Sequence, residues 1–224
     1  MNFEYFIAKR IVSAKEYKNS ISSPIIKIAI LSIVIGFVTM LISIASGVGL
    51  QNKIYQKVSA FNGDIIISNF DTNFSDDSQN PISTIQGFYP TFSSIKGIQH
   101  IQATASKGGV IRTPNKFEGV VVKGVGKDYD WNYFNEFLID GSLPDYSHLL
   151  TNKILISEYT STRLNLKVGD KLNTFFFNSD NSKLPRSRSF KVSGIYNSGF
   201  NEFDEKFVIA DIRHIQRLNK WSEN

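Results

Sequence analysis

The sequence predicts an α+β fold, in which one N-terminal transmembrane helix is followed by a mixed α+β domain. From Ile28 to Asn52, 25 consecutive residues carry no charge. From residue 64 onward, short β-rich runs are interleaved with fewer helical segments. Of the 224 residues, 42% are hydrophobic and 13% are aromatic, which is enough for a packed core. These observations favour an anchored globular domain.

The excess of positive charge lies at the N-terminus. Residues 1–27 contain five Lys or Arg and two Glu, a net charge of +3, whereas the whole chain carries +5. The remaining 20 basic and 18 acidic side chains nearly cancel, so the body lacks the electrostatic footprint of a nucleic-acid-binding protein. The chain has no cysteine, which excludes disulfides and thiolate chemistry and leaves the redox compartment open.

Residues 1–23 are expected to form a cytoplasmic amphipathic elbow. Apolar residues recur at helical spacing while basic residues lie mainly elsewhere around the helix, as in a segment that lies on an anionic membrane surface. The apolar residues are Phe3, Phe6, Ile7 and Ile11, and the basic ones are Lys9, Arg10 and Lys15. A disordered basic tail is the alternative.

Residues 24–50 are expected to form the transmembrane helix. At about 1.5 Å of rise per residue, some 20 apolar residues cross a hydrocarbon core of roughly 30 Å. Ser32, Thr39 and Ser43 can return their hydroxyls to carbonyls one turn earlier, and Ser32 with Gly36 offers a small face for helix packing. A cleaved signal peptide has a shorter apolar run, and a buried core helix is rarely apolar all round, so a signal anchor is favoured.

The flanks of this helix predict its orientation. Lys and Arg are in excess before it, against Lys53 and Lys57 after it, which predicts a cytoplasmic N-terminus and residues 51–224 outside. Residues 51–63 keep helical periodicity through Val58 and Phe61, and Asn62-Gly63 is a stop signal. The helix is therefore expected to continue beyond the membrane as a stalk.

Residues 64–224 are expected to form the outer domain. Its strands are predicted at residues 64–68, 100–106, 109–112, 118–124, 135–139, 153–157, 171–178, 189–196 and 206–210. Helices are predicted at residues 89–96, 158–164 and 212–219, the second closed by Asn165. Gly169-Asp170 predicts a tight turn, and Gly194 predicts a bulge or a close backbone approach.

No arrangement of residues predicts chemistry, so the chain is not expected to be an enzyme. His100, His148 and His214 stand apart, without the spacing of metal ligands. No nucleophile elbow, dinucleotide loop or P-loop occurs, and the acidic pairs lack the frame of a calcium loop. We therefore expect no catalytic, cofactor-binding or metal-binding residues.

Several short motifs follow one another in a specific order. They are Phe6-Ile7-Ala8-Lys9-Arg10, Phe61-Asn62-Gly63-Asp64-Ile65, residues 121–125 (VVKGV), 137–141 (FLIDG), 154–157 (ILIS), 164–170 (LNLKVGD) and 190–196 (FKVSGIY), then Gly199 and Asp204. In this order they resemble the FtsX-like, MacB-type family of ABC-transporter permeases, and within it the lipoprotein-releasing (LolC/LolE-like) branch. The resemblance covers nearly the whole chain.

The resemblance implies a fold, a location and partners. The outer domain would be a MacB-like periplasmic core domain, anchored by a single pass in the bacterial inner membrane. It would relay the motion of a cytoplasmic ABC ATPase to the periplasm, a mechanism called mechanotransmission, for the release of lipoprotein or another amphiphile. A second permease subunit, identical or not, would complete the transporter, and a periplasmic lipoprotein chaperone is a further expected partner.

The same resemblance points to one candidate contact site. In lipoprotein-releasing members, a β-hairpin between the strands that correspond here to residues 171–178 and 189–196 binds the chaperone. The partner-contact loop at residues 179–188 accordingly contributes Lys183, Leu184, Pro185, Arg186 and Arg188. A plain hairpin connection is the alternative.

Family members continue into further domain sequence and three more membrane helices, so this chain is expected to be an N-terminal portion, with its core domain incomplete at the C-terminus. A signal-anchored periplasmic binding or scaffold module without transport activity is the competing hypothesis. A membrane-tethered hydrolase would require a clustered catalytic constellation.

Overall fold

The computed structural model describes residues 3–13, 22–70, 77–78, 80–132, 134–177 and 185–222. The chain divides into two compact units, Met1–Ser59 and Ala60–Asn224.

The first unit is helical. Helix α1 spans Phe3–Ser13, and α2 spans Ser22–Asn62, so that its last turn belongs to the second unit. Helix α2 runs unbroken through the expected membrane and stalk segments, with Pro24 in its first turn, where proline is tolerated. Gly63 follows with φ +75°, which confirms the predicted stop signal.

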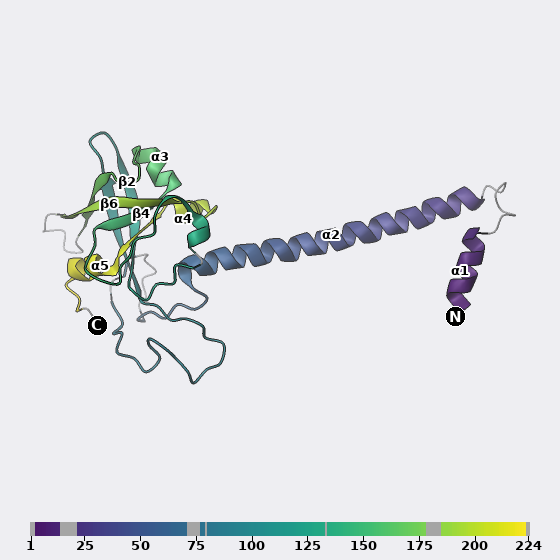
Figure 1. The fold of residues 1–224 in the computed structure, drawn as a ribbon, viewed down its shortest axis with the longest axis horizontal. Helices are drawn as coiled ribbons and strands as arrows, with labels where there is room; N and C mark the ends of the chain where they lie inside the picture. The colour runs from purple at the N-terminus through teal and green to yellow at the C-terminus, as the bar shows by residue number, and fades with distance from the viewer. Residues whose placement is uncertain are drawn as a thin grey trace. The chain divides into compact units, whose positions relative to one another are not determined.

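The second unit is built on a seven-stranded mixed sheet (Figure 1). Its strands are β1 (Thr104–Arg112), β2 (Phe117–Val125), β3 (Leu138–Gly141), β4 (Lys153–Ser157), β5 (Lys171–Phe176), β6 (Arg186–Tyr196) and β7 (Phe207–Asp211). Their order is β3-β6-β4-β7-β2-β1-β5. Pairs β2–β7 and β4–β6 are parallel, and the other pairs are antiparallel.

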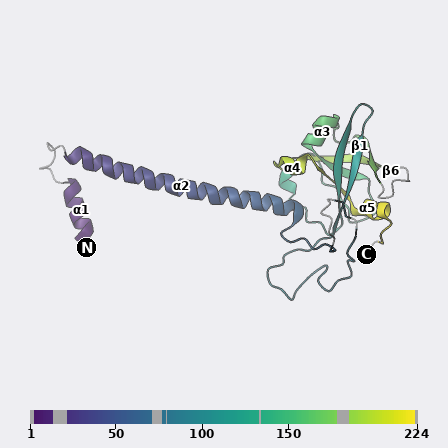
Figure 2. The same cartoon turned by 180° about the vertical axis from the view of Figure 1, so that it is seen from behind.

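The sheet closes on itself because β6 is long. Its N-terminal half pairs with β5, the far edge of the order, while its C-terminal half pairs with β4 and β3. The short helices of this unit are η2 (Asn135–Phe137, a 3-10 helix), α3 (Glu158–Leu164), α4 (Asn201–Asp204) and α5 (Ile212–Asn219). Helices α3 and α5 lie well apart in both views (Figures 1 and 2).

Each face of the sheet carries its own core. One cluster is mainly aliphatic and includes Val122, Ile154 and Val208 from the strands, with Leu164 of α3 and Ile215 of α5. The other cluster is mainly aromatic and gathers Phe61, Tyr129, Phe134, Phe137, Tyr146 and Tyr196. Alternate residues of a strand face opposite sides, so β2 contributes to both clusters.

Local signals predicted several elements correctly. The bounds of β4, α3 and α5 are those expected from the sequence. Ser157 caps α3 by accepting a hydrogen bond from the Thr160 amide, and Asn165 ends it in the left-handed conformation. The ladder between β4 and β6 shifts register at Ser193, which confirms the bulge predicted next to Gly194.

The segment before β1 was predicted wrongly. Residues 64–68 form no strand and residues 89–96 form no helix (Figure 2). Ile65, Ile66 and Ile67 are 61–81% exposed, so this β-rich run has no ladder or packed face in the described residues. β-Propensity is expressed only where a neighbouring strand and a core are present.

Other differences concern boundaries. The two strands expected at residues 100–106 and 109–112 form one strand, β1, which begins at Thr104, because Lys107 and Gly108 between them remain paired with β2. The expected strand at 135–139 is the short helix η2 followed by β3, and α4 was not predicted. A four-residue helix gives too little periodicity to be recognised in a sequence.

Candidate functional site

Helix α2 has the surface of a membrane span. Among the described residues, it is the one helix long and apolar enough to cross a bilayer, over Pro24–Ser59. Its isoleucine, leucine and phenylalanine side chains between Ile28 and Leu50 are exposed. Ser32, Thr39 and Ser43 each donate to the carbonyl oxygen four residues earlier at 2.8–3.0 Å, as predicted, so their polar groups are satisfied within the helix.

The last turn of α2 ends inside the aromatic cluster of the domain unit. Phe61 is 1% exposed, whereas most of the side chains that precede it in the helix are exposed. Its ring stacks on Phe203 at 4.9 Å and on Phe137 at 5.6 Å, and meets Phe134 edge-on at 5.3 Å. Offset and edge-to-face contacts at these distances are favourable, so Phe61 is a central member of this core.

A buried lysine meets the same turn. Lys123, in the middle of β2, is 6% exposed, and its ammonium donates a hydrogen bond to the carbonyl oxygen of Phe61. Carbonyls in the last turn of a helix have no intrahelical partner, and a cation there is also attracted by the negative end of the helix dipole. Burial lowers the pKa of Lys123 to about 8.

The structure divides the residues of the expected partner-contact loop. Lys183 and Leu184 lie outside the described residues. Arg186 and Arg188 belong to β6, opposite Phe176 and Thr174 of β5, so the expected loop at 179–188 ends earlier than predicted. Arg186 donates to the Leu218 carbonyl at 2.7 Å, a contact within the domain that a solvent-exposed loop residue would not make.

Pro185 lies in a shallow hollow that the sequence did not predict. The turn between β1 and β2 comes beside the loop end of the β5–β6 hairpin, and both contribute to the lining. The lining residues are Val110, Arg112, Thr113, Pro114, Asn115, Lys116, Phe117, Phe175, Phe177 and Pro185. Phe117 and Phe177 are 77% and 60% exposed, and such a pair of aromatic side chains at one place is typical of a contact surface.

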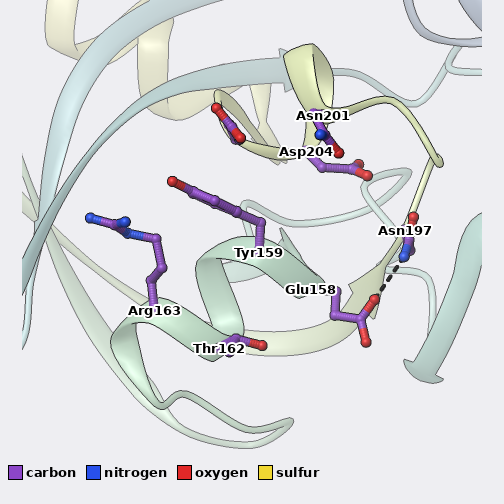
Figure 3. Close-up of a pocket in the computed structure, with 8 residues that line it drawn as sticks. Glu158, Tyr159, Thr162, Arg163, Asn197, Asn201 and Asp204 are labelled. Carbon is purple, nitrogen blue, oxygen red and sulfur yellow. Dashed lines mark hydrogen bonds between the residues drawn. The ribbon is translucent and has the colours of Figure 1, made fainter.

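A second hollow lies between α3 and α4 and is lined by polar side chains (Figure 3). Glu158 is turned toward Asn197, whose amide donates to its carboxylate at 2.7 Å. Arg163 donates to Glu118 at 2.7 Å, and the buried Asp204 accepts from the Ser198 amide at 3.1 Å. These hydrogen bonds stabilise the local scaffold around the hollow.

The histidines occupy separate positions. The His214 ring is buried with Nε2 3.0 Å from the Thr151 carbonyl oxygen, and burial lowers its pKa. His100 contacts the Asp128 carbonyl at 2.6 Å, and the exposed His148 lies 3.9 Å from Asp145. Among the residues described, no group of three or more His, Asp or Glu could hold a metal ion.

Comparison with protein families places the chain. The sequence model of the MacB-like periplasmic core domain matches residues 28–223, which includes most of α2 and the whole sheet. The chain belongs to this family. In this MacB-like chain, an N-terminal apolar helix precedes a core domain of mixed helices and strands, which confirms the predicted fold class.

Two solved structures are similar to the MacB-like chain at low identity. One is the extracellular domain of the noncanonic ABC-type transporter YknZ from Gram-positive bacteria, with 13% identity, a TM-score of 0.39, and 55% of this chain covered. The other is a domain of a permease protein from Porphyromonas gingivalis, with 17% identity, a TM-score of 0.34, and 58% covered. The alignments span 60% and 54% of those chains. Comparison with curated protein sequences gives no significant match.

The short motifs of the sequence converge in the MacB-like domain. Phe61, Lys123, Phe137 and Tyr196 come from four separate motifs, and their side chains meet at the C-terminal end of α2. Gly194 lets β6 approach its neighbours, because a Cβ there would lie 2.9 Å from both Leu138 and Leu155 side chains. In the structure, these motifs therefore meet where the helix end joins the sheet. From the sequence alone, they were interpreted only as scaffold positions.

Proposed function

We propose that this chain is the N-terminal portion of a permease subunit of an ABC transporter, acting without catalysis of its own. Helix α2 would cross the bacterial inner membrane once, with α1 on the cytoplasmic side and the core domain in the periplasm. The domain would relay motion driven by a cytoplasmic ATPase to a periplasmic substrate. Family membership and the apolar surface of α2 support this proposal.

One observation supports the proposed transmission of motion from the membrane to the domain. Helix α2 is continuous from Ser22 to Asn62, and its last turn is part of the domain core through Phe61. A helix without a break transmits displacement along its axis, whereas a flexible linker would absorb it. A signal-anchored scaffold module has no need of such a continuous connection.

Copurification tests the transporter assignment. The tagged chain, or the longer gene product that contains it, is extracted from its native membranes in mild detergent, and associated proteins are identified by mass spectrometry. We expect an ABC ATPase and a second permease subunit in stoichiometric amounts. Recovery of the intact chain with neither protein would contradict the proposal and favour the signal-anchored scaffold.

The finer proposal concerns the substrate. We propose that the transported molecule is a lipoprotein or another amphiphile, and that a periplasmic chaperone for it contacts the hollow lined by Phe117, Phe177 and Pro185. Exposed aromatic rings flanked by Arg112 and Lys116 suit a partner with apolar and acidic groups.

A pair of variants tests this contact. Phe117→Ser removes an exposed ring from the hollow, and Leu149→Ser removes an exposed apolar side chain outside it. Truncation of a central aromatic contact costs more than about 1 kcal/mol, so Phe117→Ser should weaken chaperone binding at least about fivefold. Leu149→Ser should leave binding unchanged. Equal binding by both variants would remove the hollow from the proposal.

A further inference from the structure

The end of α2 is held by two different kinds of contact. The Phe61 ring is enclosed by Phe134, Phe137 and Phe203, and its carbonyl oxygen receives the Lys123 ammonium from β2. The ring contacts are apolar and tolerate small rotations, whereas the hydrogen bond fixes the direction of the last turn. Both partners belong to the domain unit, Ala60–Asn224.

A lysine at this position destabilises the fold through desolvation of its ammonium group, so a compensating contact is expected. β2 is buried on both faces from Val120 to Val125, and Lys123 lies opposite Ile209 of the neighbouring β7. An apolar side chain there would avoid the desolvation of an ammonium, so stability of the sheet alone does not favour lysine. The compensating contact is the hydrogen bond that Lys123 donates to the Phe61 carbonyl, because a buried carbonyl without a donor is itself destabilising.

We propose that Lys123 is a positioning residue that fixes the C-terminal end of α2 to strand β2, so that the helix end and the sheet move as one body. Its use in transport rests on the proposed function, whereas the fixed helix end does not. β2 lies between β7 and β1 in the sheet, so a displacement of the helix end is passed to both neighbours. The Phe61 ring adds a second route, through Tyr196 of β6.

Amide hydrogen exchange on the full chain in detergent micelles tests this role without an ATPase. Lys123→Met keeps an unbranched side chain of nearly the same length and removes the donor. We expect the amides of residues 58–62 to exchange at least about tenfold faster, while the amides of β2, β4 and β7 keep their protection. Unchanged exchange at the helix end in a folded Lys123→Met domain would overturn the proposal.

Lys107→Met is the matched control. Lys107 is also 6% exposed and also lies in the middle of a strand, but its ammonium is 3.8 Å from Asp77 and does not contact the helix end. It should leave exchange at residues 58–62 as in the wild type. Loss of helix-end protection in this control to the same extent would make the effect a general one of removing a buried lysine, and would overturn the specific role.

A double variant separates positioning from general stability. In Phe61→Ala the ring contacts that hold the helix end are already lost, so adding Lys123→Met should accelerate helix-end exchange much less than it does alone. Fully additive effects would contradict the role. If Lys123→Met leaves no protected sheet amides, Lys123→Gln, which retains a neutral donor, decides the question by the same comparison of helix-end and sheet amides: protection of both the helix end and the sheet supports the role of the donor, and a protected sheet with an unprotected helix end contradicts it.

Discussion

Asp211 and Arg213 form a charged pair at the start of α5, in which the carboxylate is buried and the guanidinium is partly exposed. The Asp211 carboxylate is fully buried and caps the helix by accepting from the Arg213 amide at 3.0 Å, while the Arg213 guanidinium returns to it at 2.6 Å. The same guanidinium donates to the carbonyls of Tyr146 and His148, which belong to the loop before β4. The Arg213 side chain therefore links the N-terminal cap of α5 to the loop before β4.

Arg213→Met should destabilise the domain strongly. The substitution leaves a buried carboxylate without its cation, which costs roughly 3 kcal/mol and should lower the Tm by about 6 to 12 °C. Arg163→Met, which removes the exposed partner of Glu118, is the control and should cost less than about 1 kcal/mol. Thermal denaturation in detergent measures both, and similar losses in the two variants would contradict this role of Arg213.

His214 should make stability depend on pH. Burial lowers its pKa in the folded state below the ordinary 6.5, although the Thr151 carbonyl and Asp211 act in the opposite direction. Between that lowered pKa and 6.5 the unfolded chain binds more protons than the folded one, so stability falls as the pH falls through this window.

The measurement is the Tm at pH 7.5 and at pH 5.5. His214→Gln keeps an N–H donor that does not titrate, so it should lose less Tm on acidification than the wild type. His148→Gln changes an exposed histidine in the same way and should keep the wild-type loss. An acid response that is the same in His214→Gln as in the wild type would exclude His214 as its source.

Single residues were predicted from the sequence where their role is local. Asn165 as a helix terminator and Gly194 as a close approach follow from what those residue types do to the backbone. The contact between Lys123 and Phe61 joins residues 62 apart, and nothing in the neighbourhood of either one indicates the other. Its sequence signal was the position of both residues in short motifs of the family.

At the scale of elements, the contact between α5 and β2 depends on a glycine. A Cβ at Gly124 would lie 2.7 Å from the Cα of Ile212 and 2.8 Å from the Ile215 side chain. Gly119, in the same strand, has no atom within 4 Å of that position. The two glycines of β2 therefore have different reasons to be glycine.

Gly124→Ala should cost about 1 to 3 kcal/mol, because α5 must move away from the sheet. Gly119→Ala should be neutral or slightly stabilising, since alanine restricts the unfolded chain more than glycine does. Chemical denaturation of the two variants in the same detergent gives the comparison. Equal stability of the two variants would show that α5 does not approach β2 as closely as described.

Elements were predictable where the local pattern agreed with the final contacts. β4 and α3 have a strand run, a serine cap and an asparagine terminator in sequence, and all three signals operate in the structure. Residues 64–68 have an equally strong strand pattern, yet no neighbouring strand pairs with them in the described residues. Pairing is a property of two segments, so one segment's propensity could not decide it.

At the scale of the whole molecule, α2 has two parts that require different surroundings. Most of the helix carries large apolar side chains that are exposed along its length, a surface that suits the apolar interior of a bilayer. Its last turn requires the aromatic core of the domain. The apolar part was predictable from the sequence, since a run of 25 uncharged, largely apolar residues is typical of a membrane span.

The most direct test is the position of each unit relative to a membrane. The chain contains no cysteine, so single cysteines introduced at exposed sites can be labelled without background. We place one at Asn115→Cys in the domain and one at Glu4→Cys in α1, and treat spheroplasts with a membrane-impermeant maleimide. We expect Asn115→Cys to react in intact spheroplasts and Glu4→Cys to react only after permeabilisation. Labelling of Glu4→Cys in intact spheroplasts with Asn115→Cys protected, or recovery of the chain in the soluble fraction, would contradict the proposed topology.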